Sequence, residues 1–266
     1  MHILDTIVQQ KKKEVSALKE LHSLEKLIAS LDTDIAVTSL KASIMAAPHG
    51  GIISEFKKKS PSKKNINLKS KISEVVAGYN QAGVAGISVL TDASFFGGHT
   101  QDLEAALAIT KVPVLRKEFI IDPYQIYQSK ALGAHAILLI ARILTPEEIK
   151  TFTQLAQELN LEVLVEIHNQ KELDKCPPNI DIIGVNNRDL DTFKVNYENS
   201  IQLKDQLPED LCKISESGIS DTDTMVRLRE EGFDGFLIGE MFMATADPGV
   251  ACQMFLKEYK DKMELR

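Results

Sequence analysis

The sequence predicts an α/β fold: a single (β/α)8 TIM barrel, residues 49–266, after an N-terminal helical extension, residues 1–48. Short apolar segments alternate with amphipathic helical segments from Gly51 onward, which indicates a parallel sheet covered by helices. Eight such segments occur in about 200 residues, the length of a small barrel of this class. The start of the chain instead has helical spacing without a strand-like run. We expect the whole chain to form one domain.

The extension is expected to be helical. A second helical stretch near Leu24–Leu31 follows the first and precedes a polar break at Asp32–Asp34. The run Lys11–Lys13 is interpreted as the solvated face of the first helix, as charge runs usually are. The sequence leaves open whether the extension closes over the barrel mouth, caps the barrel bottom or meets a partner. The first helix is indicated by Ile3, Leu4, Ile7 and Val8.

The barrel strands are expected to be short aliphatic runs, because parallel strands are buried on both faces. Helices begin where a capping residue precedes proline, at Asp122-Pro123 and Thr145-Pro146, and end at Gly83, Gly133 and Gly232. The predicted strands are Ile52–Phe56, Gly86–Leu90, Pro113–Arg116, Ala136–Ile140, Glu162–Ile167, Ile182–Val185, Leu211–Ser215 and Gly235–Ile238. The predicted helices include Ile72–Ala82, Leu103–Thr110, Pro123–Leu132, Pro146–Leu159 and Thr222–Glu231.

A doubly wound open sheet is the alternative architecture. It would usually have fewer strands and a glycine-rich nucleotide loop after the first of them. Here the first strand is followed by Lys57–Pro61, without the G-x-G-x-x-G spacing. The barrel is therefore the preferred interpretation.

Charge and cysteine content argue against several classes of protein. The 266 residues include 31 Lys+Arg and 38 Asp+Glu, a net charge of −7, whereas nucleic-acid binding needs a basic surface. Three cysteines without metal-like spacing argue against a disulfide framework or a zinc site and favour a reducing, cytoplasmic location. We expect no membrane segment, because the apolar runs are too short to cross a bilayer, and no secretory signal is recognised.

Ionisable residues lie at the ends of predicted strands, where a barrel of this class builds its active site. By the two-residue period of a strand, their side chains share the face that points into the barrel mouth. Buried charges are costly unless they pair, so charges in phase around one cavity favour a functional cluster over separate solvated residues. Lysines paired with glutamates also suit acid–base chemistry near neutrality. The ionisable residues are Glu55, Lys57, Lys117, Glu166, Arg188 and Glu216, and the neutral polar residue Asn186 is expected on the same face.

The ends of the last two strands predict a phosphate site. Ser215–Ser220 and Ile238–Glu240 place small residues where backbone N–H groups are exposed at helix starts. Ser60–Lys64 is interpreted either as an anion-contacting loop or as a solvated loop. Phe95–Gly98 is interpreted either as core aromatics beside a turn or as an aromatic wall of the mouth. His168, which follows a strand, is interpreted as a solvated loop residue.

As a set, the motifs resemble those of the indole-3-glycerol phosphate synthase family, and they occur in family order from about residue 51 to residue 250. The helical extension is also a trait of this family. The matching segments are Glu55–Ser62, Val89–Asp92, Phe95–Gly98, Val114–Lys117, Phe119–Gln125, Leu164–Glu166, Gly184–Leu190, Glu216–Ile219 and Phe236–Gly239.

The resemblance implies a carboxy-lyase of tryptophan biosynthesis. Its reaction would be ring closure of 1-(2-carboxyphenylamino)-1-deoxy-D-ribulose 5-phosphate to indole-3-glycerol phosphate, with release of CO2 and water. It implies no metal and no organic cofactor. The expected partner is the small phosphorylated substrate, and the chain is expected to be a monomer, with a homodimer as the alternative.

The resemblance also implies roles for individual residues. Lys117 would be the general acid and Glu166 the acid–base group of the dehydration, while Glu55 and Lys57 would orient the substrate and poise the acid. Asn186 and Glu216 complete the expected catalytic set through further substrate contacts. The expected substrate-binding residues are Ser60, Phe96, Arg188, Ser217, Gly218, Leu237 and Gly239, with the phosphate at the two glycines.

Other functions and three departures from the family pattern remain to be weighed. Phosphoribosylanthranilate isomerase, another phosphosugar barrel, would share the phosphate site but not the two lysines with Glu166 and Asn186. A barrel that only binds a phosphorylated ligand would not need a lysine–glutamate pair. The departures are Glu118, where aspartate is common, Lys64, where glycine often occurs, and His99, where serine is frequent. They concern loop contacts rather than the reaction.

Overall fold

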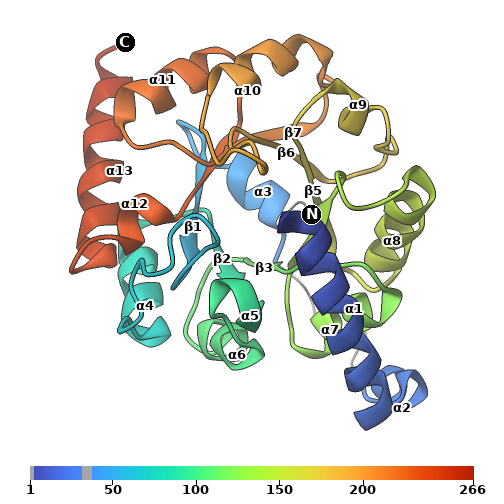
Figure 1. Ribbon diagram of the computed structural model, residues 1–266. Coiled ribbons are helices and arrows are strands. Elements are labelled where there is room, and N and C mark those ends of the chain that lie inside the picture. The colour runs from blue at the N-terminus through green and yellow to red at the C-terminus, as the bar shows by residue number, and fades with distance from the viewer. Residues whose placement is uncertain (1–2, 32–37) are drawn as a thin grey trace.

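Eight parallel strands close into a barrel in the computed structural model, which describes residues 3–31 and 38–266 (Figure 1). Each strand pairs with the next along the chain, and β1 pairs with β8 to complete the ring. The predicted fold class is confirmed, and each predicted strand boundary lies within one residue of the observed one. The strands are β1 Gly51–Phe56, β2 Gly86–Leu90, β3 Val114–Lys117, β4 Ala136–Ile140, β5 Glu162–Ile167, β6 Ile182–Asn186, β7 Cys212–Glu216 and β8 Gly235–Ile238.

Helices surround the barrel (Figure 1). Gly83, Gly133 and Gly232 follow helices with positive φ, as the sequence predicts. The helix predicted at Leu103–Thr110 begins and ends three residues earlier, because the Thr110 hydroxyl bonds the backbone of Val112 and closes a turn there. The outer helices are α4 Ile72–Ala82, α6 Thr100–Leu107, α7 Pro123–Ala131, α8 Pro146–Glu158, α10 Glu198–Leu203, α11 Thr222–Glu230 and α13 Pro248–Glu264. Shorter elements are α5 Ala93–Phe96, α9 Gln170–Leu173, the 3₁₀ turn Lys204–Gln206 and α12 Glu240–Met243.

The helices of the extension lie at both ends of the barrel. Helix α3, Leu40–Met45, closes the bottom, where the strands begin. Its Leu40 and Ile44 are fully buried, and Glu162 at the start of β5 accepts hydrogen bonds from the Leu40 and Lys41 amides at 2.6 and 2.9 Å. Gly86 leaves the space that Leu40 occupies, since a Cβ there would lie 2.5 Å from Leu40 Cδ1.

Helix α1, Ile3–Leu21, lies at the opposite end, beside α7 (Figure 1). Its Ile3, Leu4 and Ile7 reach the mouth of the barrel, so different helices of the extension cover the mouth and cap the bottom. Helix α2, Leu24–Ala29, follows and ends two residues before the predicted end. The polar break predicted at Asp32–Asp34 lies outside the described residues.

The interpretation of Lys11–Lys13 as a solvated run is wrong for Lys11. Lys12 and Lys13 are exposed, but Lys11 is 5% exposed and shares the buried stripe of α1 with Ile7 and Val15. The helical period turns this residue alone of the three toward the barrel. Its burial is possible because acidic residues from two barrel loops meet it there.

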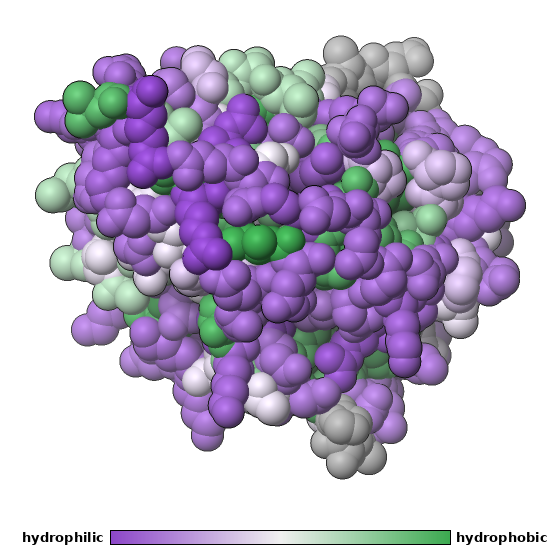
Figure 2. All heavy atoms as spheres, turned by 90° about the horizontal axis from the view of Figure 1, so that it is seen from above, coloured by the Kyte–Doolittle hydropathy of each residue, from purple (hydrophilic) through white to green (hydrophobic). Residues whose placement is uncertain are grey.

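The surface has the polarity expected outside a closed core. Figure 2 shows hydrophilic side chains over most of the face seen from above, with apolar side chains in small areas between them. One large apolar cluster packs between the sheet and the helices, and a second fills the barrel interior and reaches α1 and α3. No helix in the described part of the chain is long and apolar enough to cross a membrane.

Candidate active site

A cavity of about 380 Å³ opens at the carboxyl ends of the strands. All the predicted site residues line it except Glu216, whose carboxylate lies buried against Lys117. The lining residues among those predicted are Glu55, Lys57, Ser60, Phe96, Lys117, Glu166, Asn186, Arg188, Ser217, Gly218, Leu237 and Gly239. The structure therefore brings together residues from β1, β3, β5, β6 and β8, from helix α5, and from the loops after β1, β6, β7 and β8.

Four ionisable side chains form one layer across the floor of this cavity. They are Glu55 of β1, Lys117 of β3, Glu166 of β5 and Glu216 of β7. Alternate strands supply each layer of a barrel of this kind. Two residues earlier on the same four strands, the residues are apolar and fully buried: Ile53, Leu115, Leu164 and Ile214. The polar floor of the mouth thus rests directly on a packed apolar layer, which shields it from water below.

Lys117 contacts each carboxylate of this layer. Its Nζ lies 2.6 Å from Glu216 Oε2, 3.6 Å from Glu55 Oε2 and 3.8 Å from Glu166 Oε2. A second ammonium, that of Lys57, lies 2.7 Å from Glu55 Oε1. Neighbouring strands leave room for this arrangement, because a Cβ on Gly184 would overlap the Glu216 carboxylate. Together with Lys57, the layer brings two cations to three carboxyl groups.

The layer moves the pKa values of its members in different directions. Burial by itself lowers the pKa of Lys117, but Glu216, Glu55 and Glu166 together raise it above its ordinary value. Burial alone would raise the pKa of Glu55, yet Lys57 and Lys117 hold it below its usual range. For Glu216, burial outweighs the attraction of Lys117 and raises its pKa to about 7. The site therefore pairs a lysine that stays charged with a carboxyl group that titrates near neutrality.

The loops after β7 and β8 form one rim of the cavity. Ser217 and Gly218 have left-handed backbone conformations, with φ of 67° and 76°. A Cβ on Gly218 would also overlap the Val195 side chain, so both conformation and space favour glycine. Gly239 lets β8 end close against Glu55, since a Cβ there would lie 2.7 Å from Glu55 Cβ. Backbone amides beside these glycines are the kind of donors that bind phosphate.

Two cations flank the same rim. Arg188 Nη2 lies 3.3 Å from Glu240 Oε2, and Lys63 Nζ lies 3.6 Å from Glu240 Oε1. Sequence reasoning did not name Lys63 or Glu240 as site residues, although Lys63 lies within Ser60–Lys64, interpreted as either an anion-contacting or a solvated loop, and Glu240 within Ile238–Glu240, predicted to form part of the phosphate site. Glu240 therefore lies between two cations at this rim of the cavity.

The opposite wall is apolar and aromatic. The rings of Phe96 and Phe119 have centroids 5.7 Å apart, and both line the cavity. Phe95–Gly98 therefore contributes to a wall of the mouth, one of the two interpretations left open. Sequence reasoning missed Phe119 and the α1 residues as cavity lining. The helical spacing of Ile3, Leu4 and Ile7 indicated an apolar helix face, but it did not show which end of the barrel this face covers. The other leucine and isoleucine side chains from the barrel that line the cavity include Leu90, Leu138, Ile140, Leu190 and Leu237.

The interpretation of His168 as solvated is wrong. Its side chain is 8% exposed, and Nδ1 lies 3.0 Å from Glu172 Oε2, which also accepts from the His168 amide at 2.8 Å. Nε2 faces Glu166 Oε1 at 3.7 Å. Burial lowers the pKa of His168, but Glu172 and Glu166 raise it more. The reason for the error is α9, which turns back directly after the strand and brings Glu172 under the imidazole.

The three residues that depart from the family pattern differ in burial. Glu118 is buried and accepts hydrogen bonds from the Thr91 hydroxyl at 2.7 Å and from the Phe119 amide at 2.8 Å. Lys64 is exposed, and His99 is exposed at the start of α6.

Within residues 3–31 and 38–266, no cluster of three or more His, Cys, Asp or Glu side chains could hold a metal.

Comparison with known proteins decides the family. Residues 4–255 match the family described as indole-3-glycerol phosphate synthase. The chain belongs to this family. A member from Bacteroides thetaiotaomicron is 47% identical over 255 residues, which cover 96% of this chain and 98% of that protein. A member from Legionella pneumophila strain Paris is 42% identical over 263 residues, which cover 96% of this chain and 99% of that protein.

Solved structures outside this family share the fold. Tryptophan synthase subunit alpha from Legionella pneumophila matches with a TM-score of 0.60 at 14% identity, over 87% of this chain and all of that one. Thiamine phosphate pyrophosphorylase from Pyrococcus furiosus matches with a TM-score of 0.59 at 14% identity, over 84% of this chain and 98% of that one. At this level of identity, the likeness extends to the barrel alone.

Proposed function

We propose that the cavity catalyses ring closure of 1-(2-carboxyphenylamino)-1-deoxy-D-ribulose 5-phosphate to indole-3-glycerol phosphate, with release of CO2 and water. The observation that carries the proposal is the layer in which Lys117 lies among three carboxyl groups beneath an aromatic wall. Membership of the family supports the same reaction. The chain would act as a carboxy-lyase in tryptophan biosynthesis.

In the first step, the ring carbon that bears the carboxylate attacks the ketone carbon, and the C–C bond of the new ring forms. Negative charge develops on the ketone oxygen, and Lys117 donates a proton to it. The surrounding carboxylates suit this role because they keep the lysine protonated before the reaction. Departure of CO2 then leaves its bonding electrons in the ring and restores aromaticity.

In the second step, water is lost from the alcohol that the first step forms. The C–O bond of this alcohol breaks as its oxygen takes up a proton and leaves as water, and the neighbouring ring CH2 loses a proton so that its electrons form the C=C bond of the indole. Glu166, whose Oε2 lies 3.8 Å from Lys117 Nζ, is placed to move these protons. Glu55 and Lys57 form a 2.7 Å ion pair that orients the substrate and adjusts the field at Lys117. Asn186 and Glu216 pair in register on β6 and β7 and complete the catalytic set.

The remaining residues divide between the two ends of the substrate. The phosphate would bind at the rim formed by the loops after β7 and β8, close to Arg188 and the loop after β1. The carboxyphenyl ring would lie against the apolar wall. The residues proposed for the phosphate end are Ser60, Arg188, Ser217, Gly218 and Gly239, and those for the apolar end are Phe96 and Leu237.

The experiment is to supply the purified protein with this substrate in the presence of a metal chelator and follow the fluorescence of the indole product. We expect turnover without added metal or cofactor. Absence of turnover by folded protein would contradict the proposal. Supplying phosphoribosylanthranilate in parallel tests isomerisation, the alternative that the family match does not favour.

We further propose a cytoplasmic monomer of one domain. Cys176, Cys212 and Cys252 are all free thiols, and two of them are buried, which suits a reducing compartment. Sedimentation at several protein concentrations should give a mass near 29.5 kDa. A mass twice as large would instead establish the homodimer, and two separate unfolding transitions would contradict the single domain.

A further inference from the structure

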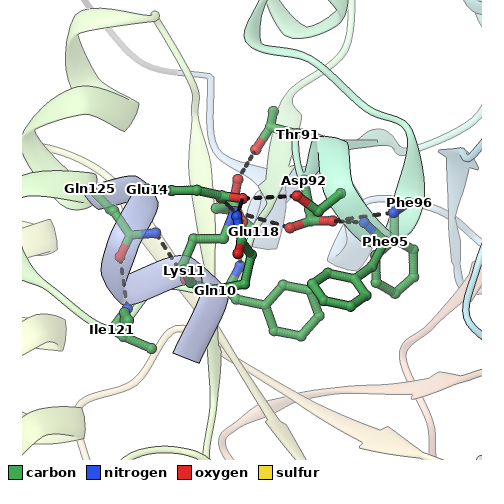
Figure 3. A network of polar contacts seen from close by, with 12 residues as sticks. Gln10, Lys11, Glu14, Thr91, Asp92, Phe95, Phe96, Glu118, Ile121 and Gln125 are labelled. Atoms are coloured by element: carbon green, nitrogen blue, oxygen red, sulfur yellow. Dashed lines mark hydrogen bonds and ion pairs between the residues drawn. The ribbon is translucent and has the colours of Figure 1, made fainter. Parts of the chain in front are cut away.

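Lys11 brings a buried charge from α1 to two loops at the barrel mouth (Figure 3). Its Nζ lies 2.6 Å from Glu14 Oε2, 3.0 Å from Asp92 Oδ2 and 3.0 Å from Glu118 Oε1. The side chains of Asp92 and Glu118 are 1% and 4% exposed, so the three charges are almost completely enclosed. Burial lowers the pKa of Lys11, but Glu118 and Asp92 raise it more, and the amine stays charged.

The two carboxylates that Lys11 joins each accept a hydrogen bond from the backbone amide of a residue in the aromatic wall. Asp92 Oδ1 accepts hydrogen bonds from the Phe95 and Phe96 amides at 2.7 and 3.2 Å and so caps α5. Glu118 Oε1 accepts from the Phe119 amide at 2.8 Å. Figure 3 shows the Asp92 and Glu118 carboxylates turned toward Lys11, with the Phe95 and Phe96 amides on the side of Asp92 away from Lys11. The ammonium is therefore connected to Phe96 and to Phe119 through one side chain each.

Nothing in the proposed chemistry uses this charge. Lys11 does not line the cavity, whereas Ile3, Leu4 and Ile7 of the same helix do. A lysine in an apolar helical stripe weakens folding unless its partners compensate for the lost hydration. The position of Lys11 between two loops that carry cavity residues suggests that its purpose is to arrange those loops.

We propose that Lys11 is a positioning residue for the substrate ring. Its ammonium holds the loop after β2, the loop after β3 and helix α1 together, so that Phe96, Phe119 and the apolar end of α1 form one continuous wall. The proposal rests on the proposed function, because it assigns that wall to the carboxyphenyl ring. A wall that contacts the ring equally before and during the reaction affects binding rather than the chemical step.

The first test compares Lys11→Met with Lys12→Met, which removes an exposed lysine from the neighbouring position of the same helix. Because the two carboxylates would then repel each other without a cation between them, we expect Lys11→Met to raise KM about tenfold with kcat changed by less than about threefold. Lys12→Met should leave both constants unchanged. A loss of kcat at unchanged KM in Lys11→Met would overturn the proposal.

A double-mutant cycle tests the route through the aromatic wall. Because Phe96 is one of the wall residues that Lys11 is proposed to place, Lys11→Met should raise KM by a smaller factor in a Phe96→Ala background, where the wall is already incomplete, than in the parent protein. An equal rise in KM in both backgrounds would show that the two residues act independently and would overturn the proposal.

A second variant serves if Lys11→Met fails to fold. Glu118→Gln removes one charge of the cluster and keeps an acceptor oxygen. KM should rise in this variant, and an unchanged KM would contradict the proposal.

Hydrogen exchange separates this proposal from the proposed reaction, because it needs no turnover. In Lys11→Met, amides of residues 3–21 and 92–96 should exchange about tenfold faster than in the parent protein, with Lys12→Met unchanged. Unchanged exchange in Lys11→Met would overturn the positioning role even if the enzyme is active. If the enzyme shows no turnover but exchange in Lys11→Met rises as expected, the proposed reaction is overturned. The link between α1 and the two loops is then retained.

Discussion

Lys117 is surrounded by carboxyl groups, and these groups explain how a buried lysine keeps its charge. Three carboxyl oxygens lie within 3.8 Å of its Nζ, and together they outweigh the effect of burial on its pKa. An ammonium that is charged and fixed in place stabilises a developing oxyanion without reorganisation of solvent. The carboxyl groups therefore set the charge state of Lys117 as well as its position.

Replacement of Lys117 tests this role directly. Lys117→Ala should lower kcat by about 100-fold or more, since general acid catalysis contributes on that order. The matched control is Lys150→Ala, which removes an exposed lysine from α8 and should leave kcat unchanged. If KM alone rose in Lys117→Ala, the lysine would be a binding residue, and Lys57 would become the candidate acid.

The raised pKa of Glu216 predicts that the free energy of unfolding depends on pH. Its pKa is raised from 4.5 to about 7, so the folded protein binds a proton that the unfolded chain has released between these pH values. Stability from this group is therefore present below about pH 4.5 and is lost as the pH rises through about 7. Glu216→Gln keeps a neutral side chain at every pH and removes this dependence.

Urea unfolding at about pH 5 and about pH 8 measures the effect of Glu216. The free energy of unfolding of the parent protein should fall relative to that of Glu216→Gln by up to about 3 kcal/mol between the two pH values. A Glu74→Gln variant, altered at an exposed carboxylate on α4, should follow the parent protein. Parallel curves for the parent and Glu216→Gln would show that Glu216 does not titrate in this range.

At the scale of elements, short-range signals define where helices begin. Thr145 illustrates this at α8, where its hydroxyl accepts from the Glu148 amide at 3.2 Å and Glu148 returns a bond to the Thr145 amide at 2.8 Å. This capping box and Pro146 are visible in the sequence, and α8 begins at the predicted residue. No contact from a distant part of the chain is needed to place this boundary.

The cap predicts a local loss of stability without loss of function. Thr145→Ala should lower the free energy of unfolding by about 1 kcal/mol, because an amide at the start of α8 loses its acceptor. Thr151→Ala, at an exposed position within the same helix, should be neutral or slightly stabilising, since alanine favours helix. Denaturant unfolding of both variants distinguishes the cap from a general effect of threonine replacement.

At the scale of the whole molecule, the two ends of the barrel have different tasks. Helix α3 closes the end where strands begin, through Leu40 and Ile44, while the opposite end carries the ionisable layer and the cavity. In barrels of this class, residues at the bottom contribute to stability and residues at the top to chemistry. The extension serves both ends, because α1 and α3 lie on opposite sides of the same barrel.

A substitution at the bottom of the barrel tests whether its two ends have separate tasks. Ile44→Ala removes a fully buried side chain and should lower the free energy of unfolding by about 2–5 kcal/mol. Measured well below the unfolding temperature, kcat should be unchanged, because the packed apolar layer separates Ile44 from Lys117. Met45→Ala, at a side chain 55% exposed, should change neither quantity. A fall in kcat for Ile44→Ala would show that the two ends are coupled.

The sequence by itself determined the strands and the floor of the site. Short aliphatic runs can be read locally, and the two-residue period of a strand shows which side chains at its end share a face. The closure of the barrel then brings the ends of alternate strands to one layer. That is why Glu55, Lys117, Glu166 and Glu216 could be predicted to meet although they lie far apart in the chain. Phe96 could be placed only between two alternatives, because a local pattern does not show what a loop packs against.

Only the tertiary structure decided whether single polar residues are buried or solvated. Lys11 belongs to a run that is usually solvated, and it is buried because Asp92 and Glu118, from loops about 80 and 107 residues further along the chain, come together beside α1. His168 is enclosed because α9 returns over it. Whether a charge can be buried depends on the partners that reach it, and the fold alone determines those partners. The same reason explains why only the structure could show that α1 covers the mouth while α3 caps the bottom.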